Sequence, residues 1–100
     1  MINFLKNIFN TGPKIDLQEI ISRGAIIVDV RTVKEFQAGH LNHSKNIPLD
    51  KLHESLSKLD KNKPVITCCA SGARSASARR LLLSNGFTEV YNGGSWMSLK

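Results

Sequence analysis

The sequence has little cysteine: two residues of 100, Cys68 and Cys69, adjacent to each other. This number and spacing suit neither a disulfide framework nor a zinc site with two-residue gaps between its ligands. The pair is therefore interpreted as a site of thiol chemistry or as buried side chains. Because nothing in this cysteine usage requires an oxidising compartment, we expect a cytoplasmic protein.

The sequence also lacks a long hydrophobic run. No apolar stretch approaches the eighteen or more residues that span a bilayer, so we expect no membrane span. The apolar segment from Met1 to Phe9 is too short for a signal peptide and lacks a small-residue cleavage site before the polar residues 10–13. We expect it to form a helical turn or two against the domain, with an interfacial or partner-binding helix as the alternative.

Aromatic side chains are scarce around the basic residues. Fourteen lysines and arginines against eight acidic residues give a formal net charge of +6, which favours anionic ligands or partners. The basic residues are scattered along the chain, without the interleaved aromatic residues of a surface on which nucleic-acid bases stack. We therefore expect a small anionic ligand and no nucleic acid.

One hundred residues suffice for one domain, and the chain shows no internal repeat. We assign residues 1–14 to an N-terminal extension and 15–100 to the domain. Capping residues and apolar runs predict helices over 17–23, 33–38, 51–59 and 75–85, and strands over 25–30, 46–48, 65–68 and 89–92. The expected helix caps are Asp16, Thr32 and Asp50, and the expected helix ends are Gly24, Gly39 and Gly86.

The alternation of strands and helices predicts the fold class. Continuous apolar strands, such as residues 25–30, are typical of a parallel sheet that is buried on both faces. The sequence predicts a three-layer α/β domain, with a central, mainly parallel sheet of four or five strands and helices on both faces. Ligands of such folds bind beyond the carboxyl ends of the strands, so the residues after strand 65–68 are the candidate site.

The segment after this strand joins it to the amino end of a helix. Its small residues let backbone N–H groups point inward, where the helix dipole adds to an anion-binding cradle. A cysteine at the rim of this cradle has its thiol pKa lowered, which favours the nucleophilic thiolate. The candidate catalytic residue is Cys69, and the candidate substrate-binding residues are Ala70, Ser71, Gly72, Ala73, Arg74 and Ser75.

Several linked motifs resemble the rhodanese superfamily. With a glycine three positions and an arginine five positions after Cys69, the segment resembles the six-residue active-site loop of that family. The resemblance covers about residues 15–96. It extends to Asp29, Val30 and Arg31, to Glu35 and Phe36, to Gly39, His40 and Leu41, to Asn46, Ile47 and Pro48, and to Gly93, Gly94 and Trp96.

The resemblance implies a sulfurtransferase. Cys69 would attack the outer sulfur of a donor such as thiosulfate, become a persulfide, and pass the sulfur to cyanide, a thiol or a protein. The loop amides from Ala70 to Arg74 would hold the persulfide, and Arg74 would hold the shape of the loop or meet the donor. We expect modest thiosulfate activity, a protein persulfide as a further donor, and neither a metal nor a cofactor. The sequence departs from the family pattern at Asn42 and His43, which concerns only the local turn.

Two alternatives remain open at this point. Counted from Cys68, the interval to Arg74 resembles that of protein tyrosine phosphatases, but Thr67 stands where that family usually has histidine. A cysteine-dependent phosphatase or arsenate reductase is therefore the weaker alternative. The stronger alternative is a rhodanese-like module that binds partners or carries sulfur between proteins without turnover, because the loop does not encode the donor or the acceptor.

The remaining polar residues near these motifs are interpreted as structural. Consecutive strand residues face opposite sides of a sheet, so if Cys69 opens into the loop, Cys68 is expected to point into the core. Trp96 is expected at the core or the rim of a pocket. Structural hydrogen bonds or ion pairs, rather than catalysis, are expected for Asp29, Arg31, Glu35 and His40.

Overall fold

The computed structural model describes residues 15–100, in which helices and strands alternate along the chain. The strands are β1 (Ile26–Asp29), β2 (Ser44–Asn46), β3 (Val65–Cys69) and β4 (Val90–Ser95). The α-helices are α2 (Leu17–Ser22), α3 (Val33–Ala38), α4 (Leu49–Leu52) and α5 (Ala73–Ser84). Two 3-10 helices are η2 (His53–Lys58) and η3 (Trp96–Leu99).

Within these residues the four strands form one sheet, in the order β2-β1-β3-β4, with every neighbouring pair parallel. In the centre of the sheet Val28 of β1 pairs with Thr67 of β3, and on the other side of β3 Val65 pairs with Val90. The central position of β1 and β3 explains why both strands are almost wholly apolar: neither of their faces meets solvent.

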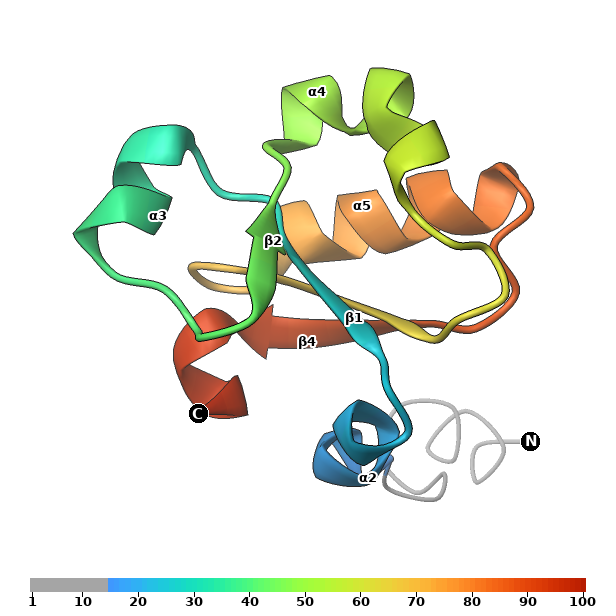
Figure 1. Ribbon diagram of the computed structural model, residues 1–100. Helices are drawn as coiled ribbons and strands as arrows, with labels where there is room; N and C mark the ends of the chain where they lie inside the picture. Colours follow the sequence, from blue (N-terminus) through green and yellow to red (C-terminus); the bar gives the residue numbers. More distant parts are fainter. Residues whose placement is uncertain (1–14) are drawn as a thin grey trace, which may run out of the picture.

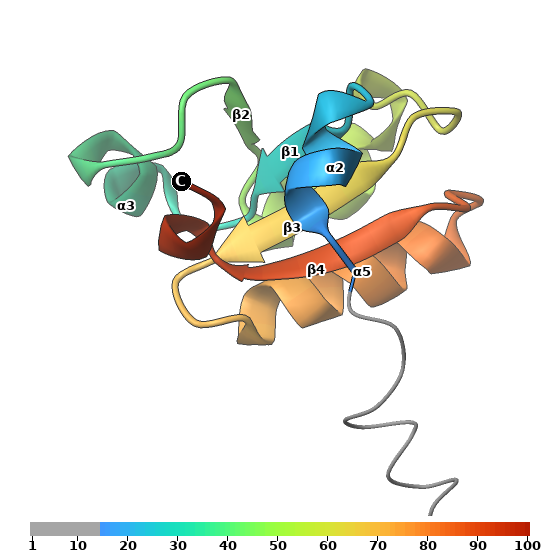
Figure 2. The same ribbon diagram turned by 90° about the horizontal axis from the view of Figure 1, so that it is seen from below.

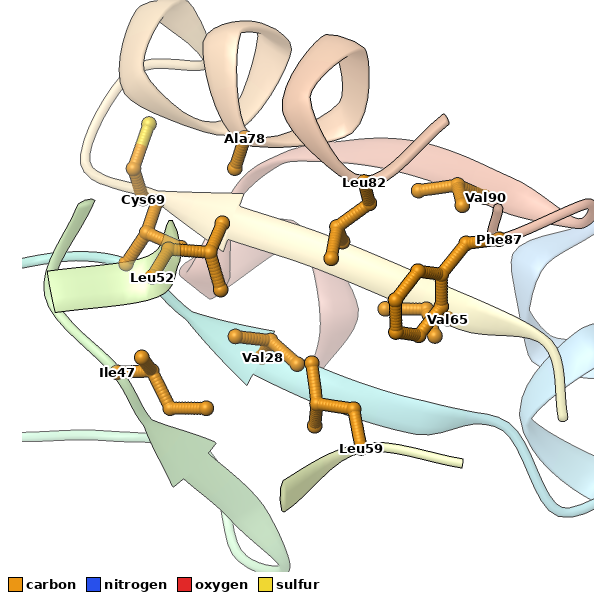
Figure 3. Packing of buried hydrophobic residues seen from close by; sticks show 11 residues of the cluster. Val28, Ile47, Leu52, Leu59, Val65, Cys69, Ala78, Leu82, Phe87 and Val90 are labelled. Carbon is orange, nitrogen blue, oxygen red and sulfur yellow. The ribbon is translucent and has the colours of Figure 1, made fainter. Parts of the chain in front are cut away.

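Helices cover both faces of this sheet (Figures 1 and 2), which confirms the predicted three-layer α/β domain. Side chains alternate along the strands, so the two faces have separate cores. The core on the α5 side (Figure 3) includes Val28, Leu52, Leu59, Val65, Cys69, Ala78, Leu82 and Phe87. The core on the other side is formed by Ile20, Ile27, Ile66, Cys68 and Leu99.

Several local signals in the sequence are confirmed. The Thr32 side chain accepts a hydrogen bond from the Glu35 amide, and the Glu35 carboxylate accepts one from the Thr32 amide, which is a complete capping box. Asp16 caps α2 by accepting hydrogen bonds from two amides of its first turn. Gly24 and Gly86 follow their helices with φ of 91° and 92°, a left-handed conformation that favours glycine.

The predictions around Pro48 were wrong. Strand β2 covers Ser44–Asn46 instead of 46–48, because its partners on β1 are residues 27–29 and Pro48 has no N–H group to extend the ladder. Pro48 instead precedes helix α4, which begins at Leu49 rather than at residue 51. Asp50, the predicted cap, lies in the first turn of α4. The N-cap residue is Pro48, which makes no side-chain hydrogen bond to the helix. The predicted single helix over 51–59 continues as the 3-10 helix η2.

The boundaries nearest the candidate site also differ from the prediction. Strand β3 includes Cys69, and helix α5 begins at Ala73, two residues before the predicted start at Ser75. Gly72 is the N-cap residue, with φ 109° and ψ −13°. This left-handed conformation turns the chain from strand to helix within three residues, which leaves the first helical amides close to the end of the strand.

Strand β4 continues through Gly93 and Gly94 to Ser95, three residues beyond the predicted strand over 89–92. Pairing with β3 shifts here, because Thr67 is opposite Asn92 whereas Cys69 is opposite Ser95. Such a bulge places an extra residue in one strand. A Cβ atom on Gly93 would lie 2.9 Å from Cγ2 of Ile66 and 3.0 Å from the Thr67 carbonyl oxygen, so only glycine fits at this position.

The segment from Met1 to Phe9 and the rest of the predicted extension lie outside the described residues, so the helical turns expected there stay a prediction. Among residues 15–100, no helix is long and apolar enough to cross a membrane. At residues 42–43, where the sequence departs from the rhodanese pattern, His43 adopts a φ of 67°. This left-handed residue forms the turn before β2 without a glycine.

Candidate active site

The candidate site lies at the carboxyl end of β3, where Cys69 ends the strand and the loop leads to the amino end of α5. The structure brings the backbone amides of three predicted residues, Ser71, Gly72 and Ser75, to the sulfur of Cys69. Ala70, Ser71 and Ala73 are themselves exposed residues of the loop. The Arg74 side chain extends toward helix α3.

Backbone amides surround the Cys69 sulfur. The Gly72 amide nitrogen lies 2.9 Å from Sγ, and the Ser75 amide nitrogen lies 3.4 Å from it. Both amides belong to the start of α5, where N–H groups lack partners within the helix and carry its positive dipole end. The Ser75 hydroxyl lies 3.5 Å from the sulfur. Cys69 itself is only 1% exposed, so these groups take the place of water around the sulfur.

These contacts determine how readily Cys69 ionises. Burial alone raises the pKa of a thiol, because a thiolate loses hydration inside the protein. In the thiolate state, hydrogen bonds from the Ser75 hydroxyl and amide, together with the amides of Gly72 and Ser71, outweigh burial and lower the pKa of Cys69 below its ordinary value. The loop can therefore stabilise a thiolate, the nucleophilic form of cysteine.

Cys68 has the opposite environment. It is fully buried in the core on the α2 side, with Ile20, Ile27 and Ile66. Burial, reinforced by the nearby Asp29 carboxylate, raises the pKa of the Cys68 thiol to about 12. The predicted core position of Cys68 is confirmed. Because Cys68 and Cys69 lie on opposite faces of the sheet, the residues that lead to Arg74 form a loop around the Cys69 sulfur and not around that of Cys68. The phosphatase alternative rested on the spacing from Cys68 to Arg74, and this spacing has no structural counterpart.

Arg74 forms a bidentate ion pair with Glu35 of helix α3. Its Nη1 and Nη2 atoms lie 2.7 Å and 3.0 Å from the two carboxylate oxygens. The Arg74 guanidinium is the main cause that lowers the pKa of Glu35 to about 2, and the Thr32 amide adds to the effect. The pair joins the active-site loop to the amino end of α3, and it balances the only charged side chain of residues 69–75.

The family model for the rhodanese-like domain matches residues 14–97. The chain belongs to this family. A thiosulfate sulfurtransferase named GlpE, from Ectopseudomonas mendocina (strain ymp), is 37% identical over 75 residues, which cover 75% of this chain and 69% of that protein. The resemblance identified from the loop and its linked motifs is thus confirmed.

Two solved structures show how this rhodanese domain compares in three dimensions. A rhodanese with anions from E. coli matches with a TM-score of 0.70 and 32% identity, covering 74% of this chain and 89% of that one. The human single-domain sulfurtransferase TSTD1 matches with a TM-score of 0.75 and 25% identity, covering 83% and 88% of the two chains. These structures confirm the predicted fold class.

The other polar residues of the rhodanese motifs make structural contacts. Arg31 and Asp29 form a buried ion pair of 2.7 Å, and the Arg31 guanidinium also donates to the Gly39 carbonyl oxygen. The same guanidinium lies 4.6 Å from the centre of the Trp96 ring, so Trp96 covers the pair. His40 stacks on Phe36 and contacts its carbonyl oxygen at 2.7 Å.

One residue of the rhodanese site, Asn92, was not predicted from the sequence. The Asn92 side chain reaches from β4 to the loop, where its Oδ1 atom accepts a 2.6 Å hydrogen bond from the Ser75 hydroxyl. Its Nδ2 atom donates to the Gly72 carbonyl oxygen at 3.3 Å. An asparagine before two glycines signals a local turn, and that signal predicts the bond from the Gly94 amide but not the contact across the sheet.

Proposed function

We propose that this protein is a sulfurtransferase that moves sulfane sulfur from a donor such as thiosulfate to a thiophilic acceptor through a persulfide on Cys69. The observation that carries the proposal is the 2.9 Å contact between the Gly72 amide and the Cys69 sulfur at the amino end of α5. An N–H group at this distance stabilises negative charge on sulfur. The names of the relatives, thiosulfate sulfurtransferase and single-domain sulfurtransferase, point to the same chemistry.

The first half of the reaction loads the cysteine. The Cys69 thiolate attacks the outer sulfur of thiosulfate, a bond forms between these two sulfur atoms, and the bond to the sulfonate sulfur breaks. Sulfite leaves with the electron pair of the broken bond, and the persulfide keeps one negative charge. Charge is conserved, since a monoanion and a dianion give a monoanion and a dianion. No metal or cofactor takes part.

The second half transfers the sulfur. An acceptor such as cyanide or a thiolate attacks the outer sulfur of the persulfide, and the Cys69 thiolate leaves. The same amides of Gly72 and Ser75 that stabilise the initial thiolate stabilise this leaving group. One site with a fixed set of donors thus serves both halves. A general base is not required, because the cysteine reacts as a thiolate.

The charge of the loop bears on which donor the site accepts. Arg74 is the one cation of residues 69–75, and Glu35 neutralises it. Arg79 donates to the Val90 carbonyl oxygen and Arg80 to the Ser77 hydroxyl, and neither guanidinium makes a hydrogen bond to residues 69–75. A dianion such as thiosulfate therefore depends mainly on backbone amides. This favours modest thiosulfate activity and a protein persulfide as a second donor.

The same neutral loop favours one alternative, in which the domain carries sulfur between proteins without turnover of free thiosulfate. Both versions need the cysteine as a free thiol, which is the state of Cys69 and of Cys68 in this structure. A reducing cytoplasmic compartment supplies that state. The two versions differ only in donor and acceptor, so the loading assay uses thiosulfate and, separately, a small-molecule persulfide.

Mass spectrometry after incubation with thiosulfate tests the proposal. The wild-type protein and Cys68→Ser are expected to gain the mass of one sulfur atom, whereas Cys69→Ser is expected to gain none. Cys68→Ser is the matched control, because it makes the same chemical change one residue away on the other face of β3. Loading of Cys69→Ser together with failure of Cys68→Ser would overturn the assignment of the nucleophile. Absence of loading in all three proteins, with thiosulfate and with a small-molecule persulfide, would overturn the proposed function.

A further inference from the structure

The Ser75 hydroxyl has one proton and three polar neighbours. Its Oγ atom lies 2.6 Å from Oδ1 of Asn92, 3.1 Å from the Gly72 carbonyl oxygen and 3.5 Å from the Cys69 sulfur. A hydroxyl donates one hydrogen bond and accepts others through its lone pairs. The direction of this single proton therefore decides what Ser75 offers to the cysteine.

The orientation of the Asn92 amide is determined by groups that allow only one role. The Gly94 amide can only donate, and it lies 2.9 Å from Oδ1. The Gly72 carbonyl can only accept, and it lies 3.3 Å from Nδ2. The atom of Asn92 that faces Ser75 is thus the oxygen, which cannot donate to the hydroxyl. At 2.6 Å from that oxygen, Ser75 must donate its proton to Asn92.

The tertiary structure holds Asn92 at this place. It pairs with Thr67 of β3 immediately before the bulge, and Gly94, with φ 73°, turns its amide back to the Asn92 side chain. No larger residue fits at Gly93 in the bulge, since its Cβ would collide with Ile66 and the Thr67 carbonyl oxygen. Ser75 is fully buried, so no bulk water competes for its proton.

The protonation state of Cys69 is linked to this arrangement. While Ser75 donates to Asn92, it presents a lone pair to the sulfur, and a lone pair accepts a hydrogen bond from a thiol but repels a thiolate. To stabilise the thiolate, the hydroxyl must turn its proton from Asn92 to Sγ. The Asn92 side-chain oxygen at 2.6 Å, the Gly72 carbonyl oxygen at 3.1 Å and the Cys69 thiolate therefore compete for the Ser75 proton, and Asn92 is the nearest of the three.

We propose that Asn92 is a positioning residue that restrains ionisation of Cys69 by holding the proton of Ser75. The proposal deepens the proposed function, since it concerns the same thiolate, and it assigns Asn92 no contact with the reacting sulfur. The competition moderates the effect of the loop amides. In a fraction of the protein molecules without bound donor, it keeps Cys69 as a thiol. It also leaves the Ser75 hydroxyl available to the Cys69 thiolate that departs during sulfur transfer.

The pH dependence of Cys69 alkylation tests this role without any sulfur donor. The rate of modification by iodoacetamide is measured across pH for the wild-type protein and Asn92→Ala, and mass spectrometry identifies the modified cysteine. Removing the nearer competing acceptor leaves only the longer contact to the Gly72 carbonyl oxygen, so the midpoint of the profile is expected to fall. Because a thiolate of lower pKa is also a weaker nucleophile, the rate on the acid side should rise about threefold, while the plateau at high pH should fall by a similar factor.

Ser75→Ala provides the decisive control. Without the hydroxyl there is no proton to release, so Asn92→Ala is expected to leave the midpoint unchanged in the Ser75→Ala background. Asn92→Asp keeps an acceptor for both Ser75 and Gly94 and adds negative charge, so its midpoint is expected to rise. A general loosening of the loop would shift both Asn92 variants in the same direction.

Two results would overturn the proposal: a midpoint in Asn92→Ala equal to or above that of the wild type, or an equal shift with and without the Ser75 hydroxyl. Neither result depends on whether the protein transfers sulfur, because alkylation reports only thiol ionisation. Conversely, a protein that forms no persulfide but shows the expected alkylation profiles would retain the Asn92 proposal and lose the proposed function.

Discussion

Cys68 and Cys69 are neighbours in the chain but belong to opposite cores of the sheet. Cys69 lies on the α5 side, with its sulfur beside the Gly72 amide, and Cys68 lies on the α2 side among isoleucines (Figure 3 shows the Cys69 side). The pKa of the first thiol is lowered and that of the second is raised to about 12. One residue along a strand thus separates a reactive environment from an inert one.

The first prediction concerns Cys68. Cys68→Ser places a hydroxyl in an apolar core, which is expected to lower the free energy of unfolding by about 1–3 kcal/mol, as measured by urea denaturation. The alkylation rate of Cys69 at pH 7 is expected to stay within about twofold of the wild-type value, because Cys68 makes no hydrogen bond to the active-site loop. A large loss of Cys69 reactivity in a folded Cys68→Ser protein would show that the two thiols are coupled.

The second prediction separates backbone strain from function at Gly72. Its φ of 109° disfavours a side chain, although a Cβ there would meet only the Gly94 Cα at 3.5 Å. Gly72→Ala is therefore expected to cost about 1–2 kcal/mol and to slow persulfide formation at least tenfold, because relief of the strain moves the amide away from Sγ. Gly24→Ala is the matched control: φ is 91°, nothing lies within 4 Å of its Cβ, and it is not part of the site. It should lose comparable stability and no activity. Equal activity of the two variants would contradict the role of the Gly72 amide.

A third prediction follows from the pair between Glu35 and Arg74. Glu35→Gln keeps a hydrogen-bond acceptor for the guanidinium but removes the negative charge, so the KM for thiosulfate is expected to fall about two- to fivefold. Steady-state kinetics with cyanide as acceptor measures it. Glu89→Gln is the control, because Glu89 pairs with Arg23 at 2.7 Å outside the active-site loop. An unchanged or higher KM in Glu35→Gln would mean that the charge of Arg74 does not reach the donor.

The fourth prediction concerns acid stability. The pKa of Glu35 is about 2 in the folded protein, below its ordinary value of 4.5, chiefly because of the Arg74 hydrogen bonds. A carboxylate whose pKa is depressed by folding contributes stability above the unfolded pKa, and this contribution is lost as the pH falls toward the folded pKa. The difference in unfolding free energy between wild type and Glu35→Gln should therefore be constant above about pH 5.5 and shrink between pH 4.5 and pH 2. Urea titrations at several pH values measure it, and a difference independent of pH over this range would contradict the ion pair.

Some of the fold could be predicted because it depends on neighbours in the chain. The capping box of Thr32 and Glu35 and the glycines after α2 and α5 involve bonds or dihedral angles within a few residues. The apolar run of β1 likewise reports burial on both faces. Boundaries near Pro48 could not be predicted, because the extent of β2 is determined by its pairing with β1 and the start of α4 by the bond from the Leu49 amide to Val30.

The sequence by itself determined the family, the parallel three-layer fold and Cys69 as the candidate nucleophile, because the loop residues are contiguous and their chemistry is local. Only the tertiary structure decided that Glu35 neutralises Arg74, 39 residues away, and that Asn92 of β4 holds the proton of Ser75. The physical reason is that both contacts join segments distant in the chain. Their partners are selected by the strand order and by the bulge at Gly93 and Gly94, and neither leaves a periodicity or spacing along the sequence.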